Sequence, residues 1–423
     1  MKTYCRPRRV LCAVVAGLWC LAAAAGEVPG RSVDGLLALA RDNNPELAGL
    51  RYEAEAAAER VAPAGALADP KFRTELRDIT RMGEQTATLL PNRVGSTRYL
   101  LMQDVPWFGK RDLKRDIAEL EAASAQGRAA GTWSEVAAKI KTTYAQLYYL
   151  EHNERLTREI LDLMVRLEKI AQARYAGGLA AQQDVIRAQL EQSAMRNELI
   201  ALEMEHHHLH TRMNALLGRP VNAALAPPEV LRPWPAPASL EFSTLEARAR
   251  GRNPLLAADE SRLKAAEKGR ELAYKNRYPD FTLGISPIQY QNAVKEWELM
   301  VELNIPLQQG TRRAQERESE NMLSAARARR DATSNQVLAD LSENVAALEA
   351  VRRSEALTRE TQLPQSELVF NAALAAYENG KVDFSTLLDA QRQIRVAKQN
   401  QIKALAEGQA RLAEIERVLG EDL

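Results

Sequence analysis

The chain has 423 residues, of which 46% are hydrophobic and 27% are charged, and its 57 Lys and Arg residues nearly balance 56 Asp and Glu residues. A net charge of +1 gives no reason to expect binding to nucleic acid, whose backbone is polyanionic. After the N-terminal segment, no run of about 18 or more apolar residues occurs, which excludes a transmembrane helix. Membrane strands remain possible, because their alternating residues average out in hydropathy.

Residues 1–25 predict a secretory signal peptide. The segment starts with basic residues and no acidic ones, continues through an apolar run and ends in alanines, with cleavage expected after Ala25. The cysteines of the chain all lie in it: Cys5, Cys12 and Cys20. The mature chain would therefore have no disulfide, cysteine metal ligand or thiol nucleophile. The bulky Trp19 disfavours lipid attachment at Cys20.

Residues 26–217 predict a first structural repeat. A helix is expected from about Ser32, and the pair Asn44-Pro45 predicts that this helix is divided in two. Asn caps the start of a helix, and Pro suits its first position. Alternating apolar and polar residues then predict strands at about 71–79 and 98–106.

A long helical hairpin is expected over residues 109–217. Its apolar residues recur at steps of four and three, which is typical of a coiled coil. The ascending arm from Gly109 to Tyr175 holds 67 residues, or about 100 Å of helix. This length exceeds what a compact domain accommodates. Gly178 is expected to allow the sharp reversal at the tip.

A histidine cluster occupies residues 206–210 of the returning arm. His206 and His210 are four residues apart and share a helix face, and neutral imidazole is a common ligand of transition metals. They are weak candidates for a metal site, because the segment carries only Glu203 and Glu205 as nearby carboxylates. His206 also falls on the coiled-coil seam, where a polar residue sets the register of the helices.

A proline-rich linker is expected over residues 218–241, which hold six prolines and therefore disfavour a regular helix. Residues 242–423 then predict a second structural repeat. It contains strands at about 279–288 and 296–306 and a helical hairpin over 310–419.

The second repeat follows the plan of the first at an offset of 200 to 209 residues. The matching pairs are Asn44-Pro45 with Asn253-Pro254, Val105-Pro106 with Ile305-Pro306, Tyr175 with Tyr377, Gly178 with Gly380, and Leu217-Gly218 with Leu419-Gly420. We therefore expect two similar hairpin tips per chain, with Gly380 allowing the second reversal. The fold class is mainly α with β.

The strand at 296–306 alternates over a length that suits a tilted membrane strand. Its apolar side carries Trp297, Leu299, Val301, Leu303 and Ile305, and its polar side carries Glu296, Glu298, Met300, Glu302 and Asn304. Soluble hairpins packed on helices are the alternative. Four strands cannot close a barrel, and lipid does not tolerate open edges. A membrane barrel would therefore need two, three or four copies of the chain.

These features resemble the TolC-type outer-membrane efflux channels, and the resemblance covers essentially all of the mature chain. The stretch 103–111, Gln-Asp-Val-Pro-Trp-Phe-Gly-Lys-Arg, is similar to the heavy-metal-resistance branch, which includes the cobalt–zinc–cadmium and copper–silver channels. The resemblance implies a homotrimer with a 12-stranded outer-membrane β-barrel, continued by a periplasmic α-helical barrel. It also implies partners, namely a periplasmic adaptor protein, an inner-membrane RND-type pump and outer-membrane lipid.

The resemblance also implies a gate at the periplasmic tips. Tyr377 matches a tyrosine that bonds across the gate, Asp184 the aspartate that receives it, and Asp389 one aspartate of an acidic ring. Two positions depart from the pattern. Val382, preceded by Lys381, stands where a gate arginine is found, and Thr386 stands where the second ring acid is found. We therefore expect a more weakly held gate.

The function expected from this resemblance is a passive conduit for export, with heavy-metal cations favoured over drugs or a secreted polypeptide as its cargo. A periplasmic coiled-coil adaptor is the alternative, although one hairpin flanked by β domains is usual for that class. The sequence holds no nucleophile motif, phosphate-binding loop or zinc signature, so we expect no enzyme activity and no cofactor.

Overall fold

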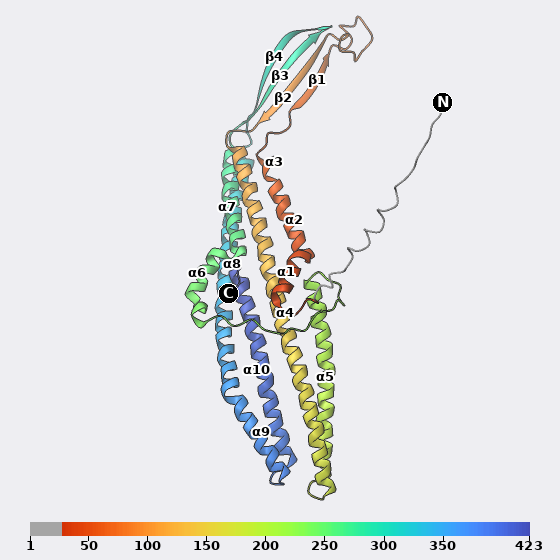
Figure 1. Ribbon diagram of the computed structural model, residues 1–423. Helices are drawn as coiled ribbons and strands as arrows, with labels where there is room; N and C mark the ends of the chain where they lie inside the picture. The colour runs from red at the N-terminus through yellow and green to blue at the C-terminus, as the bar shows by residue number, and fades with distance from the viewer. Residues whose placement is uncertain (1–27) are drawn as a thin grey trace, which may run out of the picture.

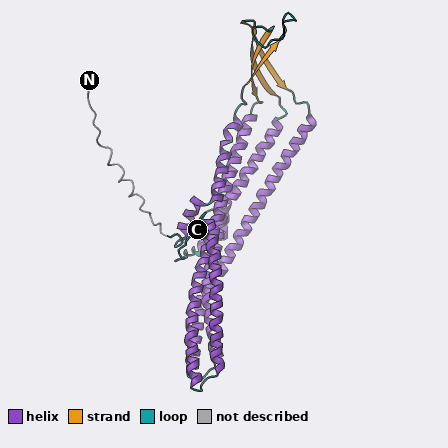
Figure 2. Ribbon diagram, turned by 90° about the vertical axis from the view of Figure 1, so that its right-hand side faces the viewer, coloured by secondary structure: helices purple, strands orange, loops and turns teal. Residues whose placement is uncertain are grey.

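The computed structural model describes residues 28–423, and the predicted signal peptide and its cysteines lie outside this range. The molecule is elongated. A small β-sheet stands at one end, two helical hairpin tips lie at the other, and the C-terminus lies near the middle of the helical body (Figures 1 and 2). Within the described range, no helix is both long and apolar enough to cross a membrane.

Both halves of the chain contain short helices, two strands and a long hairpin. The first half comprises α1 (Val33–Asn43), α2 (Pro45–Glu59), α3 (Val61–Gly65), β1 (Lys71–Arg77), β2 (Ser96–Val105), α4 (Lys110–Ala176) and α5 (Gln182–Leu216). The second half comprises α6 (Phe242–Arg252), α7 (Pro254–Lys275), β3 (Asp280–Tyr290), β4 (Ala293–Asn304), α8 (Gln309–Leu357), the π-helix η2 (Thr358–Gln362), α9 (Leu363–Glu378) and α10 (Phe384–Leu419). The predicted fold class, mainly α with β on a duplicated plan, is confirmed.

The predicted helix breaks at Asn44 and Asn253 are confirmed. Each side chain accepts a hydrogen bond from the third residue of the helix that follows, Leu47 at 3.1 Å and Leu256 at 2.9 Å. Each side chain also donates to a carbonyl at the end of its own hairpin, Leu216 at 2.8 Å and Val418 at 2.7 Å. These two asparagines therefore cap a helix and also fasten it to the hairpin.

The four strands form one antiparallel sheet in the order β1-β2-β3-β4. The two halves meet at the β2–β3 pairing, and β1 and β4 are left as edges. Phe72, Leu101, Ile285 and Leu299 stand opposite one another across the sheet. Because directly paired residues share a face, these side chains define one apolar face, here called the apolar sheet face.

The apolar sheet face is exposed in the single chain. Leu299 is 79% exposed and Trp297 69%, and Val301 and Leu303 are also exposed. The opposite face is polar, and its ion pairs cross from strand to strand: Lys71 bonds Asp104 at 2.7 Å, and Arg98 bonds Glu298 at 2.7 Å. A sheet that exposes its apolar side and pairs charges on the other has the reverse of the usual soluble arrangement.

Two local features differ from the sequence prediction. The linker over 218–241 is extended apart from a short 3₁₀-helix, Pro237–Leu240. The second ascending arm is not one continuous α-helix, because the π-helix η2 interrupts it and ends two residues before Pro364. Proline lacks the N–H group that an α-helix needs, which accounts for the break at this position.

Hydrophobic contacts within and between the hairpins supply the core. One cluster joins α1 to α4 and α5, and another joins the 3₁₀-helix η1 (Pro237–Leu240) and α6 to α8 and α10. A third cluster lies toward the tips and contains side chains of α4, α5, α9 and α10. The two hairpins are therefore packed against each other close to their tips.

Candidate functional site: the hairpin tips

The two tips have the same backbone geometry. Gly178 and Gly380 take φ angles of 67° and 72°, in the left-handed region that favours glycine. Leu179 N–H bonds Arg174 O at 2.8 Å, and Lys381 N–H bonds Ala376 O at 2.8 Å. Each ascending helix therefore ends in the same hydrogen-bonded turn.

Arg174 connects the two tips, and sequence reasoning missed it. From the last turn of α4, its Nη1 donates to Tyr377 O at 2.6 Å and to Glu378 O at 2.7 Å. Its guanidinium carbon also lies 4.9 Å from the centre of the Tyr377 ring. The cation thus contacts carbonyls at the end of α9, where the helix dipole favours positive charge. A basic residue in the last turn of α4, where the second tip has Ala376, was the available signal.

Tyr377 is buried at the tip, with 2% of its surface exposed. Its ring packs on Phe384 with centroids 5.3 Å apart. Its hydroxyl has no hydrogen-bond partner within residues 28–423. Burial is the main cause of the raised pKa of Tyr377, and the nearby carboxylate of Asp184 adds to it. Burial likewise raises the pKa of Asp184, and the positive charge of Arg187 acts in the opposite direction.

The expected bond between Tyr377 and Asp184 does not form within one chain. The two groups are close enough to influence each other electrostatically. An unpaired, buried hydroxyl is costly, and the Tyr377 hydroxyl is already covered by its own chain, so a bond to another chain would require the tip to rearrange. The bond of Tyr377 across a gate stays a prediction.

Thr386 lies in the first turn of α10 and bonds the residue that caps this helix. Asp383 caps this helix by accepting from Thr386 N–H at 3.0 Å and from its hydroxyl at 2.6 Å. These hydrogen bonds lower the pKa of Asp383 to about 2. The first tip has Ala181 at the corresponding cap and no side-chain bond there. Because Thr386 has no carboxylate, the acidic group beside the turn of the second tip is Asp383.

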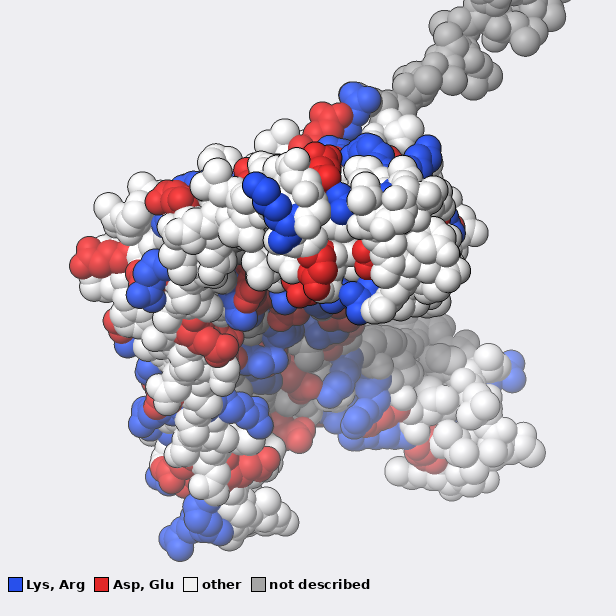
Figure 3. All heavy atoms as spheres, turned by 90° about the horizontal axis from the view of Figure 1, so that it is seen from below, with Lys and Arg blue, Asp and Glu red and all other residues white. Residues whose placement is uncertain are grey.

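The remaining predicted gate residues are exposed. Asp389 lies near Arg392, with Oδ1 3.7 Å from Nη1, and 68% of its side-chain surface is exposed. Lys381 is exposed and lies in the turn itself. Seen from the tip end, acidic and basic side chains are interspersed (Figure 3). The structure therefore brings Arg174 and Tyr377 into contact and leaves Asp389 and Lys381 in solvent.

The histidine pair lies on α5. The rings of His206 and His210 are 4.2 Å apart at an angle of 34°. Burial is the main cause of the lowered pKa of His210, and the neighbouring His206 and His207 add to it. No group of three or more His, Cys, Asp or Glu residues that could hold a metal ion occurs in the described part of the chain. The pair therefore lacks the further ligands of a metal site.

A family model described as outer membrane efflux protein matches residues 36–219 and 245–421. The chain belongs to the outer membrane efflux protein family, and the expectation of an efflux channel of the outer membrane is confirmed. The two matched segments correspond to the two structural halves, each with its own strand pair and hairpin.

Individual relatives support the same assignment. The cobalt-zinc-cadmium resistance protein CzcC of Cupriavidus metallidurans is 25% identical over 403 residues, which are 92% of this chain and 90% of that protein. The pyoverdine export outer membrane protein OpmQ of Pseudomonas aeruginosa is 24% identical over 328 residues, 74% of this chain and 66% of that protein. The crystal structure of CusC, which forms a transmembrane channel, has the same fold, with a TM-score of 0.78 at 16% identity over 93% of both chains.

Proposed function

We propose that three copies of this chain assemble into an outer-membrane channel with a gate at the periplasmic tips. Three sheets of four strands give a closed barrel of twelve, and the long hairpins continue it as a tunnel across the periplasm. The apolar sheet face is the single observation that carries this proposal, because its exposed side chains match a surface in contact with lipid.

The sheet edges support an assembly of several copies. β1 and β4 have no partner on their outer sides within the single four-stranded sheet. Unpaired backbone groups are costly in lipid, and only a closed barrel removes them. Pairing β4 of one copy with β1 of the next would satisfy both edges.

The aromatic residues near the base of the sheet fit a membrane interface. Trp107 stacks on Tyr278 and Phe281, with ring centroids 5.1 and 5.5 Å apart. These residues lie where the strands join the helices, and Trp and Tyr are enriched at membrane–water boundaries. The hydrocarbon layer would then begin just above Trp107.

The channel is proposed to be a passive conduit that performs no chemistry. A periplasmic adaptor protein and an inner-membrane RND-type pump would deliver the cargo to it. The similarity to CzcC over 92% of the chain favours heavy-metal ions as that cargo. The similarity to the pyoverdine export protein OpmQ supports a second candidate, the export of pyoverdine or a similar compound.

The proposed gate is held by contacts between tips. Arg174 clamps the two tips of one chain, and the Tyr377 hydroxyl, which its own chain buries in this conformation, would bond Asp184 across the gate once the tips rearrange on assembly. Three exposed Asp389 side chains would favour cations at the tunnel mouth. Val382 and Thr386 stand where the family pattern has a gate arginine and a second ring acid, so the Arg174 clamp would contribute much of the closure.

The cargo is tested by deleting the gene in its native host and measuring growth and cellular metal content in cobalt, zinc and cadmium. We expect the deletion strain to accumulate metal and to recover when the intact chain is restored. A deletion strain with unchanged metal content that fails to export pyoverdine would favour the second candidate. Unchanged handling of both would contradict the proposed cargo.

A further inference from the structure

A wide groove crosses the upper part of the helical body, far from the tips. Its volume is about 980 Å³, and side chains of α2, α4, α7 and α8 line it. These helices lie side by side in that order, because α2 contacts α4, α4 contacts α7 and α7 contacts α8. The groove therefore spans four neighbouring helices on one side of the wall that they form.

The floor of the groove is made of small residues. Ala118, Ala125, Ala265 and Gly269 line it, together with other alanines. Such residues leave the helix surface low, so the longer side chains around them project over a cavity. The small residues of these helices therefore leave the open volume of the groove on this side.

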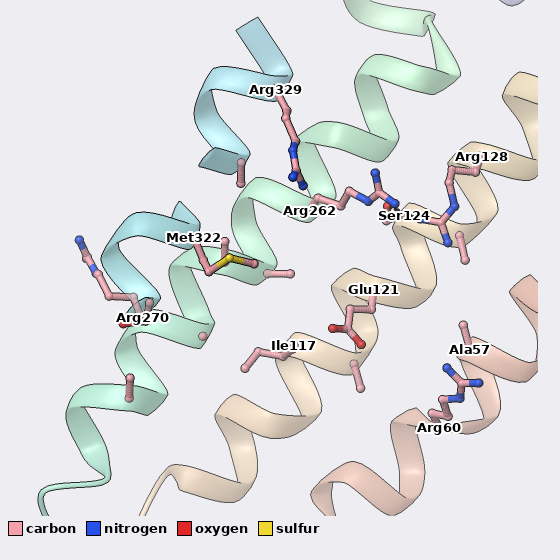
Figure 4. A pocket seen from close by; sticks show the side chains of 18 of the residues that line it. Ala57, Arg60, Ile117, Glu121, Ser124, Arg128, Arg262, Arg270, Met322 and Arg329 are labelled. Carbon is pink, nitrogen blue, oxygen red and sulfur yellow. Dashed lines mark hydrogen bonds between the residues drawn. The ribbon is translucent and has the colours of Figure 1, made fainter. Parts of the chain in front are cut away.

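Arginine dominates the charged lining. Five arginines line the groove, Arg60, Arg128, Arg262, Arg270 and Arg329, against three glutamates, Glu53, Glu121 and Glu318. Arg329 of α8, Arg262 of α7 and Arg128 of α4 follow one another across it (Figure 4).

The guanidinium groups of the groove are weakly neutralised. Arg128 donates to the hydroxyl of Ser124 at 3.2 Å, and Arg262 lies 3.7 Å from Asp259. Arg60, Arg270 and Arg329 form no ion pair with any residue in the range 28–423. Guanidinium groups bind carboxylate and phosphate groups through paired hydrogen bonds.

The groove lies on the same side of the wall as the polar sheet face. Lys110, Ile117, Glu121, Ser124 and Arg128 follow one another along α4 at steps of seven, four, three and four, so they share a helix face. Lys110 bonds Asp280 at 2.8 Å. Asp280 belongs to the polar side of β3, in line with Thr282 and Ser286. In the channel proposed above, the groove therefore faces the interior.

We propose that this groove is an anion-binding site in the channel lining, and that it takes solutes carrying two or more carboxylate or phosphate groups. The inference rests on the proposed function, since it places the groove inside the tunnel. The proposed anion site also narrows the class of solute that the channel would carry. A free divalent cation would be repelled by the net positive lining, whereas a metal ion held by an anionic ligand would be attracted.

The test uses the full chain in detergent and inorganic tripolyphosphate as the probe, with binding measured by titration calorimetry at low salt. We expect binding that weakens with added salt. In the variant R128Q/R262Q/R329Q the affinity should fall by at least about tenfold, because charged hydrogen bonds to the anion are lost.

The matched control is R313Q/R317Q/R327Q. These arginines of α8 are exposed and lie about a third to a half of a turn from the centre of its groove positions 315, 318, 319, 322, 326 and 329, so the same charge is removed away from the groove. The control should bind as the unmodified chain does. Absence of binding by the unmodified chain, retained binding by the groove variant, or equal loss in both variants would overturn the proposal.

The mass of each sample in detergent separates the two proposals. If the protein is a trimer but does not bind tripolyphosphate, only the proposed anion site is contradicted. If the protein is a monomer, the proposed assembly that places the groove inside a channel is contradicted. Unchanged helical circular dichroism in the variants establishes that the substitutions leave the fold intact.

Discussion

Arg174 is a contact that one sequence cannot reveal, because its partners Tyr377 and Glu378 lie 203 and 204 positions away. Gly178 and Gly380 were recognisable from their local turn sequence alone. The family resemblance, by contrast, identified Asp184, Asp389 and Thr386 as positions that match gate residues. It could not show that Thr386 supports the Asp383 cap, since that depends on the detailed geometry of the second turn.

Replacing Arg174 with Gln should loosen the closed tips. The substitution removes the charge that bonds two carbonyls of α9, and charged hydrogen bonds of this kind contribute about 1.5–3 kcal/mol. We expect the open fraction in planar bilayers to rise by roughly tenfold.

The matched control for Arg174 is Arg158→Gln. Arg158 is an exposed residue of the same helix whose partner, Glu154, is one turn away. Its replacement should leave the single-channel conductance and open fraction as they are. An equal rise in both variants, or none in Arg174→Gln, would count against the clamp.

Acid should weaken the second tip through Asp383. Its pKa is lowered from 3.8 to about 2, so the cap stabilises the turn fully above pH 3.8, and the stabilisation is lost as the pH falls through about 2. Hydrogen exchange of the peptide around Thr386, corrected for the intrinsic rate, should show this loss of protection. Asp383→Asn keeps a capping oxygen without a titrating group, so its protection should not change over this range. Loss of protection in both proteins would assign the effect to other groups.

For helices and strands, the spacing of apolar residues and the helix-capping pairs could be recognised in the sequence, whereas the packing between elements could not. Alternation along 296–305 identified the residues that β4 contributes to the apolar sheet face, and the Asn-Pro pairs identified the helix breaks. The π-helix at Thr358–Gln362 was missed, because the apolar spacing on either side of it continues as in an α-helix. Pro364 was the available sign of an interruption.

A charge on the apolar sheet face should prevent insertion. Leu299→Lys places an ammonium group where the side chain is 79% exposed, and lysine at the bilayer midplane costs about 2–4 kcal/mol. We expect a marked decrease of folded protein in the outer-membrane fraction. Met300→Lys, one position along on the polar side of β4, should insert normally. Equal yields of the two variants would argue that the apolar sheet face does not contact lipid.

A buried charge cluster joins the linker and both hairpins at mid-height. Glu416 of α10 is 3% exposed and bonds Lys141 of α4 at 2.7 Å and Arg232 of the linker at 2.9 Å. Lys141 also pairs with Asp422 near the C-terminus. The pairing spans 275 positions, which placed it beyond what local sequence patterns could predict.

Removing Glu416 should destabilise the protein strongly. Glu416→Ala leaves Lys141 and Arg232 without their shared partner, and breaking a buried pair in this way costs about 3–5 kcal/mol. Thermal unfolding in detergent should therefore begin at a clearly lower temperature. Glu414→Ala removes a partly exposed partner of Arg417 and should cost about 1 kcal/mol or less. Similar shifts for the two variants would contradict a special role for the cluster.

For the whole molecule, the duplicated plan and the family were recognisable from sequence, whereas the arginine-lined groove was not. Its residues come from four helices spread over residues 53–329, and each helix separately shows only scattered arginines. The tips and the groove lie at opposite ends of the helical body, so cargo that enters at the tips would reach the arginine-lined groove later.

The assembly is tested most directly by membrane fractionation followed by the mass of the detergent-solubilised protein. We predict an outer-membrane species with the mass of three mature chains, since the exposed apolar sheet face and two open sheet edges need lipid and neighbouring copies. A soluble periplasmic monomer would contradict the channel, because the same face and edges would then be in water.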